Sequence, residues 1–194
     1  MENSILGVVN NTAIKGKVEA EMLKDQQSIV LFSNPVLRKR AEAVAEYGPE
    51  LDQLLDAMAD ILYAAEGRAG LAAPQIKVSK RVVVVDCGEG KLELINPEIL
   101  ERRGEQTGPE ACLSFPGYTG IVKRANQVKV KSATRDQREI LIAAEGFAAR
   151  CLQHEIDHLD GILYIDHIQD GQLFDDRIGE QVGRVRLKQL IEAE

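Results

Sequence analysis

The chain has 194 residues, a formal net charge of −7 at pH 7, 44% hydrophobic residues and 28% charged residues. This length and composition suit one globular domain, or one domain with a tail, and argue against a disordered or fibrous protein. The acidic charge argues against binding to DNA, and no apolar stretch approaches the ~20 residues of a membrane helix, so we expect no DNA and no membrane as partners.

Residues 1–27 mix lysines with acidic residues and contain only a short apolar run. They match neither a secretion signal nor an organellar targeting segment, and we interpret them as a flexible N-terminal extension. The 3 cysteines are an odd number in a chain large enough to need no disulfides. They indicate a reducing compartment, and we therefore expect a cytoplasmic protein.

The hydrophobic pattern predicts helices at both ends and short strands between them. Apolar residues recur every three or four positions in three segments, which predicts helices over 49–65, over 144–159 and from about 174 to the C-terminus. Runs of β-branched or alternating residues predict four strands, over 81–86, 92–95, 127–134 and 139–143. This order favours an α+β fold over a doubly wound sheet. We place a main domain at 28–170 and a C-terminal helix at 171–194.

The strongest chemical signal is the run His154-Glu155-Ile156-Asp157-His158. Residues four apart lie on one face of a helix, so His154 and His158 can bind one metal ion while Glu155 exchanges a proton with water. A partly exposed helix that happens to hold two histidines is the alternative.

Two histidines do not complete a catalytic metal site, which usually has three protein ligands. The spacing that supplies a third histidine in many metalloproteases leads to Tyr164 here. Cys112 is a candidate, in a polar and turn-rich segment, although a buried structural cysteine is the alternative. Cys151 is a rival on the helix of His154 and His158. However, seven residues of helix rise about 10.5 Å, which is too far for ligands at both ends to share one ion comfortably.

The segment from Gly70 to Gln75 is the third feature. Gly70 permits close approach of another backbone, small alanines pack tightly, and the Gln75 amide can donate to a developing oxyanion. A loop that leads into a core strand is the alternative interpretation.

Together and in this order, the three segments resemble the signature motifs of the peptide deformylase family. The chain has Gly70-Leu-Ala-Ala-Pro-Gln75, Glu110-Ala-Cys-Leu-Ser114 and Gln153-His-Glu-Ile-Asp-His158. The likeness extends from Asn34 to about Asp166, which is most of the chain. It implies an α+β catalytic domain over 28–170, with small mixed or antiparallel sheets packed around a central metal-binding helix that carries the His-Glu-x-x-His motif.

The resemblance also implies a reaction and a set of site residues. The reaction is removal of formyl, as formate, from the N-formylmethionine of nascent polypeptides. One divalent metal ion per chain is expected, held by Cys112, His154 and His158; Fe(II) is the expected ion, with Zn, Ni or Co as alternatives in a purified sample. Glu155 would act as acid and base. The remaining expected residues are the oxyanion donors Gln75 and Leu113 (backbone amide), and the substrate contacts Gly70, Glu110, Phe147 and Cys151.

Three positions depart from the family pattern. Arg68 stands where the family has its first glycine, unless one residue is inserted and Gly67 takes that place. Ala111 replaces the glycine of the cysteine motif, and Thr119 stands where an arginine often anchors the peptide. Two alternatives stay open: another metallohydrolase with a different third ligand, and a binding protein that has lost turnover.

The predicted C-terminal helix carries a basic stripe. Arg177, Arg184 and Lys188 are seven and four residues apart and would lie near one face of a helix. The stripe suggests a contact with ribosomal RNA; an ordinary solvated face is the alternative.

Overall fold

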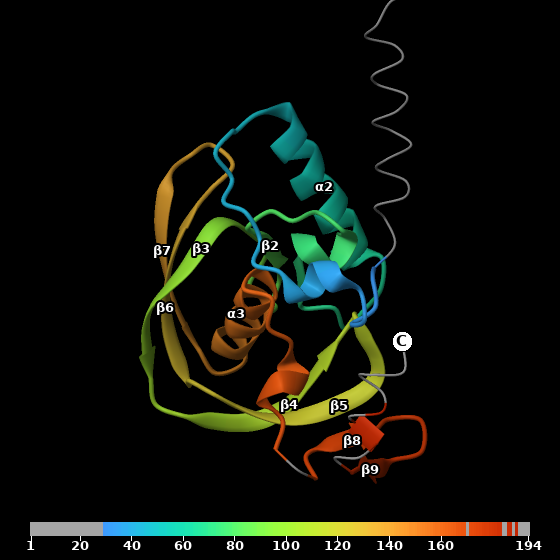
Figure 1. Ribbon diagram of the computed structural model, residues 1–194. Coiled ribbons are helices and arrows are strands. Elements are labelled where there is room, and N and C mark those ends of the chain that lie inside the picture. Colours follow the sequence, from blue (N-terminus) through green and yellow to red (C-terminus); the bar gives the residue numbers. More distant parts are fainter. Residues whose placement is uncertain (1–28, 170, 184–185, 188, 190–194) are drawn as a thin grey trace, which may run out of the picture.

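The computed structural model describes residues 29–169, 171–183, 186–187 and 189. These residues form two antiparallel β-sheets, the helices α2 (Pro49–Tyr63) and α3 (Gly146–Leu159), and short 3-10 turns. Figure 1 shows α3 enclosed between the two sheets, with α2 on the outside. The predicted α+β class with antiparallel sheets is confirmed.

The first sheet has five strands and the second has four. The spatial order of the first is β1 (Gly70–Ala72), β2 (Val82–Val85), β3 (Leu92–Arg103), β6 (Gln127–Ala133) and β7 (Glu139–Glu145). The order of the second is β4 (Gln106–Cys112), β5 (Phe115–Arg124), β8 (Leu173–Asp175) and β9 (Glu180–Val182). The 3-10 turns are η1 (Pro35–Arg38), η2 (Ala73–Ile76) and η3 (Tyr164–His167).

Strand β2 explains how the two helices share the first sheet. All four of its valines are buried, because Val82 and Val84 pack in the apolar cluster under α2 while Val83 and Val85 pack in the cluster under α3. A strand that is covered on both faces is expected to be continuously apolar, as this one is. The side of α3 that faces this sheet is apolar as well, with Ala149, Leu152, Ile156 and Leu159.

The helices predicted over 49–65 and 144–159 are confirmed, and so are the four predicted strands. Strand β3 runs on to Arg103, beyond the predicted end. Strands β4 and β5 were not predicted, because glycine, proline and charged residues interrupt the alternation in this region. None of the described helices is long and apolar enough to cross a bilayer.

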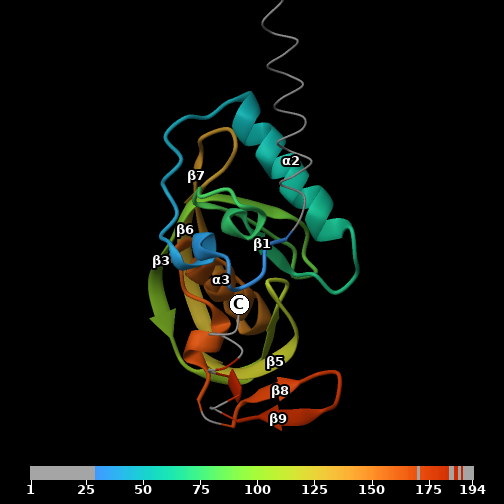
Figure 2. The ribbon, with the colours of Figure 1, turned by 45° about the vertical axis from the view of Figure 1, so that its right-hand side comes forward.

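The prediction of a C-terminal helix over 171–194 is wrong for residues 173–182, which form the β8–β9 hairpin. Leu173 and Val182 are paired partners in this hairpin and are both buried, so an apolar cluster overrides the helical periodicity. Gly171 and Gly179 have positive φ angles, which end regular helical structure. Among the residues that the structure describes after the hairpin, 186, 187 and 189 are helical. The hairpin and α2 lie at opposite ends of the molecule (Figure 2).

This correction takes Arg177 out of the predicted basic stripe. Arg177 lies in the turn between β8 and β9, and its Nη2 is 2.6 Å from Asp175 Oδ2. Arg184 and Lys188 lie outside the described residues, as does the predicted extension over 1–27.

Candidate metal centre

Helix α3 and the end of β4 bring Cys112, His154 and His158 together. Their candidate ligand atoms all lie within 4.8 Å of one another, and all three residues are buried. Cys112 Sγ is 3.3 Å from His158 Nε2. Leu113 and Ser114 form the short turn between β4 and β5, which holds Cys112 beside the helix. The cluster thus joins two histidines four residues apart to a cysteine from another segment.

These residues suit a divalent metal ion. One thiolate and two imidazoles form a ligand set that zinc, iron and related metals accept. Within the described part of the chain, two buried side-chain atoms have no hydrogen-bond partner, namely Glu155 Oε2 and His158 Nδ1. Both belong to the cluster or to its nearest neighbour in sequence, whereas buried polar atoms are normally paired. The site therefore has the donors for a metal and a carboxylate oxygen left free beside them.

The cluster also favours the thiolate form of cysteine. Burial alone would raise the pKa of Cys112, but the charge of His158 and hydrogen bonding from His154 hold that pKa well below its usual range. Burial likewise raises the pKa of Glu155, against the effect of the two histidines. The thiolate is the form of cysteine that binds metals.

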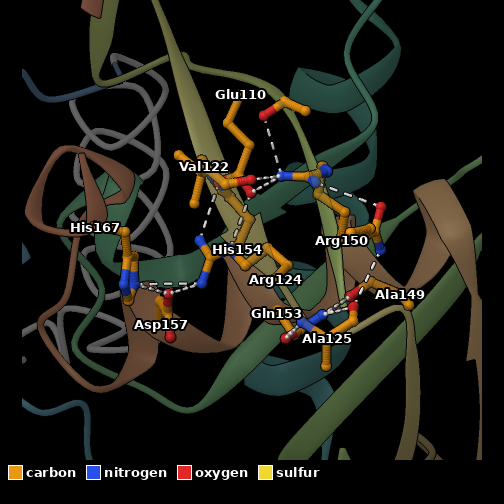
Figure 3. A network of polar contacts seen from close by, with 12 residues as sticks. Glu110, Val122, Arg124, Ala125, Ala149, Arg150, Gln153, His154, Asp157 and His167 are labelled. Carbon is orange, nitrogen blue, oxygen red and sulfur yellow. Dashed lines mark hydrogen bonds and ion pairs between the residues drawn. The ribbon is translucent and has the colours of Figure 1, made fainter. Parts of the chain in front are cut away.

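Glu110 fixes the orientation of His154 from β4 (Figure 3). Its Oε2 is 2.9 Å from His154 Nδ1. Arg124 donates two hydrogen bonds to the carboxylate, each 2.9 Å long, and Arg150 donates a third at 2.8 Å. Burial would raise the pKa of Glu110, but hydrogen bonds from His154 and Arg124 lower it to about 2. A carboxylate on Nδ1 leaves Nε2 of His154 for a metal, an arrangement common among metal-bound histidines.

The same network continues away from the cluster (Figure 3). Arg124 also donates to Asp157, at 2.5 Å, and His167 Nε2 lies 2.8 Å from the same carboxylate oxygen. Gln153 binds both the backbone N–H and the carbonyl of Ala125, at 3.1 and 3.0 Å. These contacts join α3 to the end of β5 and to η3. The buried charges are therefore connected to one another rather than isolated.

A cleft of about 530 Å³ opens beside the cluster. Every expected site residue except His158 lines it, and His158 is 1% exposed behind it. Phe147, at the rim, is 61% exposed, while Cys151 is buried in the wall. The lining residues that the sequence predicted are Gly70, Gln75, Glu110, Cys112, Leu113, Phe147, Cys151, His154 and Glu155. The structure therefore gathers side chains from three separate motifs at one opening.

Gln75 and Gly70 are held in this wall for distinct reasons. Gln75 Oε1 accepts from the Ala72 N–H at 2.9 Å, and its Nε2 donates to Ser114 Oγ at 3.3 Å and to Cys112 Sγ at 3.5 Å. The donor end of the amide therefore points at the cluster. A Cβ on Gly70 would come within 2.7 Å of the Glu155 side-chain carbons, so only glycine fits there.

Arg124 and Arg150 are the residues whose importance sequence reasoning missed. Arg150 precedes His154 by four residues, so the two share a face of α3. A positive charge on the inner face of a helix is the signal that could have identified it. Glu110 also differs from the expected substrate contact. Each oxygen of its carboxylate already has two protein donors, one of which is His154 Nδ1.

The departures from the family pattern have separate structural settings. Arg68 donates to the Ile61 carbonyl near the end of α2 and lines the cleft. Thr119 donates to Asp176 at 3.0 Å, in the turn between β8 and β9. Ala111 lies on the exposed side of β4, at the cleft. The cluster of Cys112 and the two histidines forms with all three of these residues present.

The chain is similar in sequence to proteins of one known family. A model of the polypeptide deformylase family matches residues 26–173. A peptide deformylase of Desulfitobacterium hafniense is 55% identical over 138 residues, which cover 71% of this chain and 91% of that protein. One from Halothermothrix orenii is 52% identical over 153 residues, covering 78% and 94%.

Solved structures are similar as well. The crystal structure of peptide deformylase from Thermotoga maritima has a TM-score of 0.71 at 42% identity, covering 73% of this chain and 96% of that one. A peptide deformylase from Synechococcus elongatus, in complex with actinonin, has a TM-score of 0.73 at 32% identity, covering 86% and 84%.

Proposed function

The chain belongs to the polypeptide deformylase family, and we propose that Cys112, His154 and His158 hold the metal ion for that family's reaction. The enzyme removes the formyl group from the N-formylmethionine of nascent polypeptides and releases formate. The observation that carries the proposal is the buried cluster of these three residues at the end of the cleft, next to Glu155. We assign the catalytic domain to residues 28–170.

The metal we propose is Fe(II), on the strength of family resemblance. Zinc, nickel and cobalt accept the same ligand set and are alternatives in a purified sample. When bound, a divalent ion lowers the pKa of a water molecule and polarises the formyl carbonyl. The helix α3 would thus be the metal-binding helix, and Glu110 would keep the His154 ring in the orientation that binding requires.

Glu155 is proposed as the acid and base of the reaction. It lines the cleft, and its Oε2 has no partner among the described residues. From this position the carboxylate can take a proton from the attacking water and later give it to the leaving amine. The lack of a side chain at Gly70 is what gives Glu155 its space.

Gln75 and the Leu113 backbone N–H are proposed to stabilise the negative charge that develops on the formyl oxygen. Support comes from the Gln75 amide, whose Nε2 lies 3.5 Å from Cys112 Sγ and so faces the reacting region. Leu113 follows Cys112 directly and also lines the cleft. Donors that are fixed before the reaction stabilise an oxyanion without reorganisation.

The substrate peptide is proposed to lie along β1, at the edge of the first sheet. An edge strand has unpaired backbone groups, and an extended peptide can pair with them at Gly70. Phe147 and Cys151 supply apolar surface for the methionine side chain in the same cleft. Glu110 is better assigned to positioning His154 than to contact with substrate, because its carboxylate is already surrounded by donors.

We also propose a cytoplasmic location, which the nascent substrate and the free cysteines support. We do not extend the proposal to a contact with the ribosome. Arg177, one of the three residues of the expected basic stripe, lies in a turn and pairs with Asp175.

The experiment is formate release from a formyl-Met peptide by protein purified without oxygen, together with metal analysis of the same sample. We expect turnover that depends on about one metal ion per chain and is lost on treatment with a chelator. A protein that binds the peptide and the metal without releasing formate would support the alternative of a binding protein. Turnover that survives complete metal removal would contradict the proposal.

A further inference from the structure

Cys87 and Cys151 form a second cysteine site, whose thiol chemistry the proposed reaction does not use. Cys151 lies on α3 in the wall of the cleft, and Cys87 lies two residues after β2. Cys87 is half-buried and packs against the apolar cluster that contains Cys151. Both are free thiols. The chain thus has a pair of thiols apart from the proposed metal ligand Cys112, of which Cys151 lines the cleft and Cys87 packs behind it.

The carbonyl of Ala69 places the two thiols beside each other. Cys151 Sγ donates to this oxygen at 3.4 Å. The backbone N–H of Asp86, the residue before Cys87, donates to the same oxygen at 2.9 Å. The Cys151 side chain therefore lies against the backbone that leads directly into Cys87.

The two thiols differ in reactivity. Hydrogen bonding between them lowers the pKa of Cys87 and raises the pKa of Cys151. Burial raises both pKa values, as do the nearby carboxylates, which are Asp86, Glu89 and Glu155 for Cys87 and Glu155 and Glu110 for Cys151. Cys87 is also the more accessible of the two. A thiolate reacts with oxidants whereas a thiol does not, so Cys87 is the residue that reacts first.

Cys87 lies at the start of a turn that contains two glycines. Gly88 and Gly90 both have positive φ angles, at 100° and 107°. Asp86 Oδ1 accepts from the N–H groups of these glycines, at 2.9 and 3.3 Å. Disulfide formation requires closely spaced Cβ atoms. Two glycines after Cys87 lower the backbone cost of moving Cys87 toward Cys151.

We propose that Cys87 and Cys151 are a modification site at which a peroxide forms a disulfide on the wall of the substrate cleft. The Cys87 thiolate attacks one oxygen of hydrogen peroxide, the O–O bond breaks, and Cys87 becomes a sulfenic acid as hydroxide leaves. Cys151 sulfur then attacks Cys87 sulfur, the S–S bond forms and the S–O bond breaks. The Cys151 proton leaves with the oxygen as water. The hydroxide takes up the proton that the Cys87 thiol released, so two thiols are oxidised and one peroxide is reduced to two waters.

The disulfide changes the wall that faces the substrate. Cys151 lies in the same cleft as Phe147 and Glu155, so drawing its sulfur toward Cys87 reshapes the surface beside the methionine side chain. We expect weaker substrate binding, seen as a higher KM. This consequence rests on the proposed function, whereas formation of the disulfide does not.

Peptide mapping by mass spectrometry tests the site. Zinc-loaded holoenzyme is used, because Zn²⁺ has no redox chemistry of its own. After treatment with hydrogen peroxide, alkylation of free thiols and digestion with trypsin, each cysteine lies in a separate peptide: Cys87 in 82–91, Cys112 in 104–123 and Cys151 in 151–177. We expect a cross-link between 82–91 and 151–177 that dithiothreitol removes. The matched control Cys87→Ser keeps its basal activity and forms no cross-link.

Two results would overturn the proposal. One is oxidation of Cys87 and Cys151 without a cross-link between their peptides, and the other is a cross-link that involves 104–123. In the cross-linked protein we expect KM for a formyl-Met peptide to rise about threefold or more at unchanged zinc content. After reduction of the disulfide, KM should return to the value of the untreated protein. An unchanged KM would overturn the effect on substrate. If untreated protein shows no deformylation, the proposed function fails while the peptide map still decides the disulfide.

Discussion

The two sides of α3 are built from different chemistry. Toward the first sheet the helix presents an apolar surface that includes Leu152, Ile156 and Leu159. Toward the second sheet it presents Arg150 and His154, which are buried, and Asp157, which is partly buried, and all three are bound to charged partners. The apolar side needs only shape and volume from its neighbours, whereas the polar side needs a specific partner for every charge. The difference separates residues that hold the helix in place from residues that make it a functional site.

The two sides should also respond differently to change. Burial of one aliphatic side chain stabilises a protein by about 1.5–3 kcal/mol, and any residue of similar size provides it. Removal of one partner from a buried charge pair costs about 3–5 kcal/mol, because the remaining charge stays buried. Substitutions on the polar side should therefore affect activity and metal binding, while those on the apolar side should affect stability.

The largest effect is expected for Glu155→Gln. The amide keeps the size of the side chain but cannot take or return a proton, so we expect turnover to fall by at least ~10²-fold. Metal content and thermal unfolding should stay near those of the parent protein, because the three proposed ligands are unchanged. Formate release and metal analysis on one preparation measure both. Near-normal turnover would remove Glu155 from the mechanism.

Glu110→Ala should show how strongly the polar side depends on paired charge. The change leaves Arg124 and Arg150 buried without their carboxylate and releases His154 Nδ1. We expect the free energy of unfolding to fall by about 3–5 kcal/mol and metal affinity to fall by about 10–100-fold. Denaturant unfolding and competition with a chelator measure the two losses. A variant with parental stability and affinity would show that the network does not position the histidine.

Gln75→Leu tests a cleft residue that lies outside α3, in η2. Loss of one oxyanion donor is typically worth ~2.7–4 kcal/mol, so we expect turnover to fall by about 10²-fold or more. Metal content should change little, since Gln75 is not a proposed ligand. If the whole defect followed from lost metal, Gln75 would be a structural residue.

Leu152→Ala is the matching change on the apolar side. Leu152 is buried among the residues between α3 and the first sheet, and its truncation leaves a cavity. We expect a loss of about 2–5 kcal/mol in stability, with turnover per folded, metal-loaded molecule nearly unchanged. Unfolding curves and activity normalised to metal content separate these quantities. A large loss of turnover in fully folded protein would contradict the division between the two sides.

The same comparison explains how much the sequence could predict. Helices α2 and α3 and strands β2, β3, β6 and β7 follow from local hydrophobic patterns, because each contributes to a sheet or helix face that is buried. The second sheet does not follow, since β4 and β5 contain glycine and proline, and β8 and β9 look helical until Leu173 pairs with Val182. The conformation of these four strands depends on burial against residues that are far away in the sequence.

The candidate site divides in a similar way. His154, Glu155 and His158 are recognisable because their spacing alone places them on one helix. Local sequence made Cys112 only a candidate third ligand. Its assignment to the metal, and the role of Leu113, depended on resemblance to a family, because neither residue has a fixed spacing to the histidines. The arginines that bind Glu110 come from 14 and 40 residues away in the chain, so only the folded arrangement reveals them.

The most direct test is metal analysis of Cys112→Ser beside Cys151→Ala, both purified without oxygen. Cys112 lies in the cluster of candidate ligands, whereas Cys151 Sγ donates a hydrogen bond to the Ala69 carbonyl. The account predicts that Cys112→Ser loses tight metal binding, while Cys151→Ala retains about one metal ion per chain and changes mainly in its affinity for substrate. Retention of the metal by Cys112→Ser together with its loss from Cys151→Ala would contradict the assignment of the metal centre.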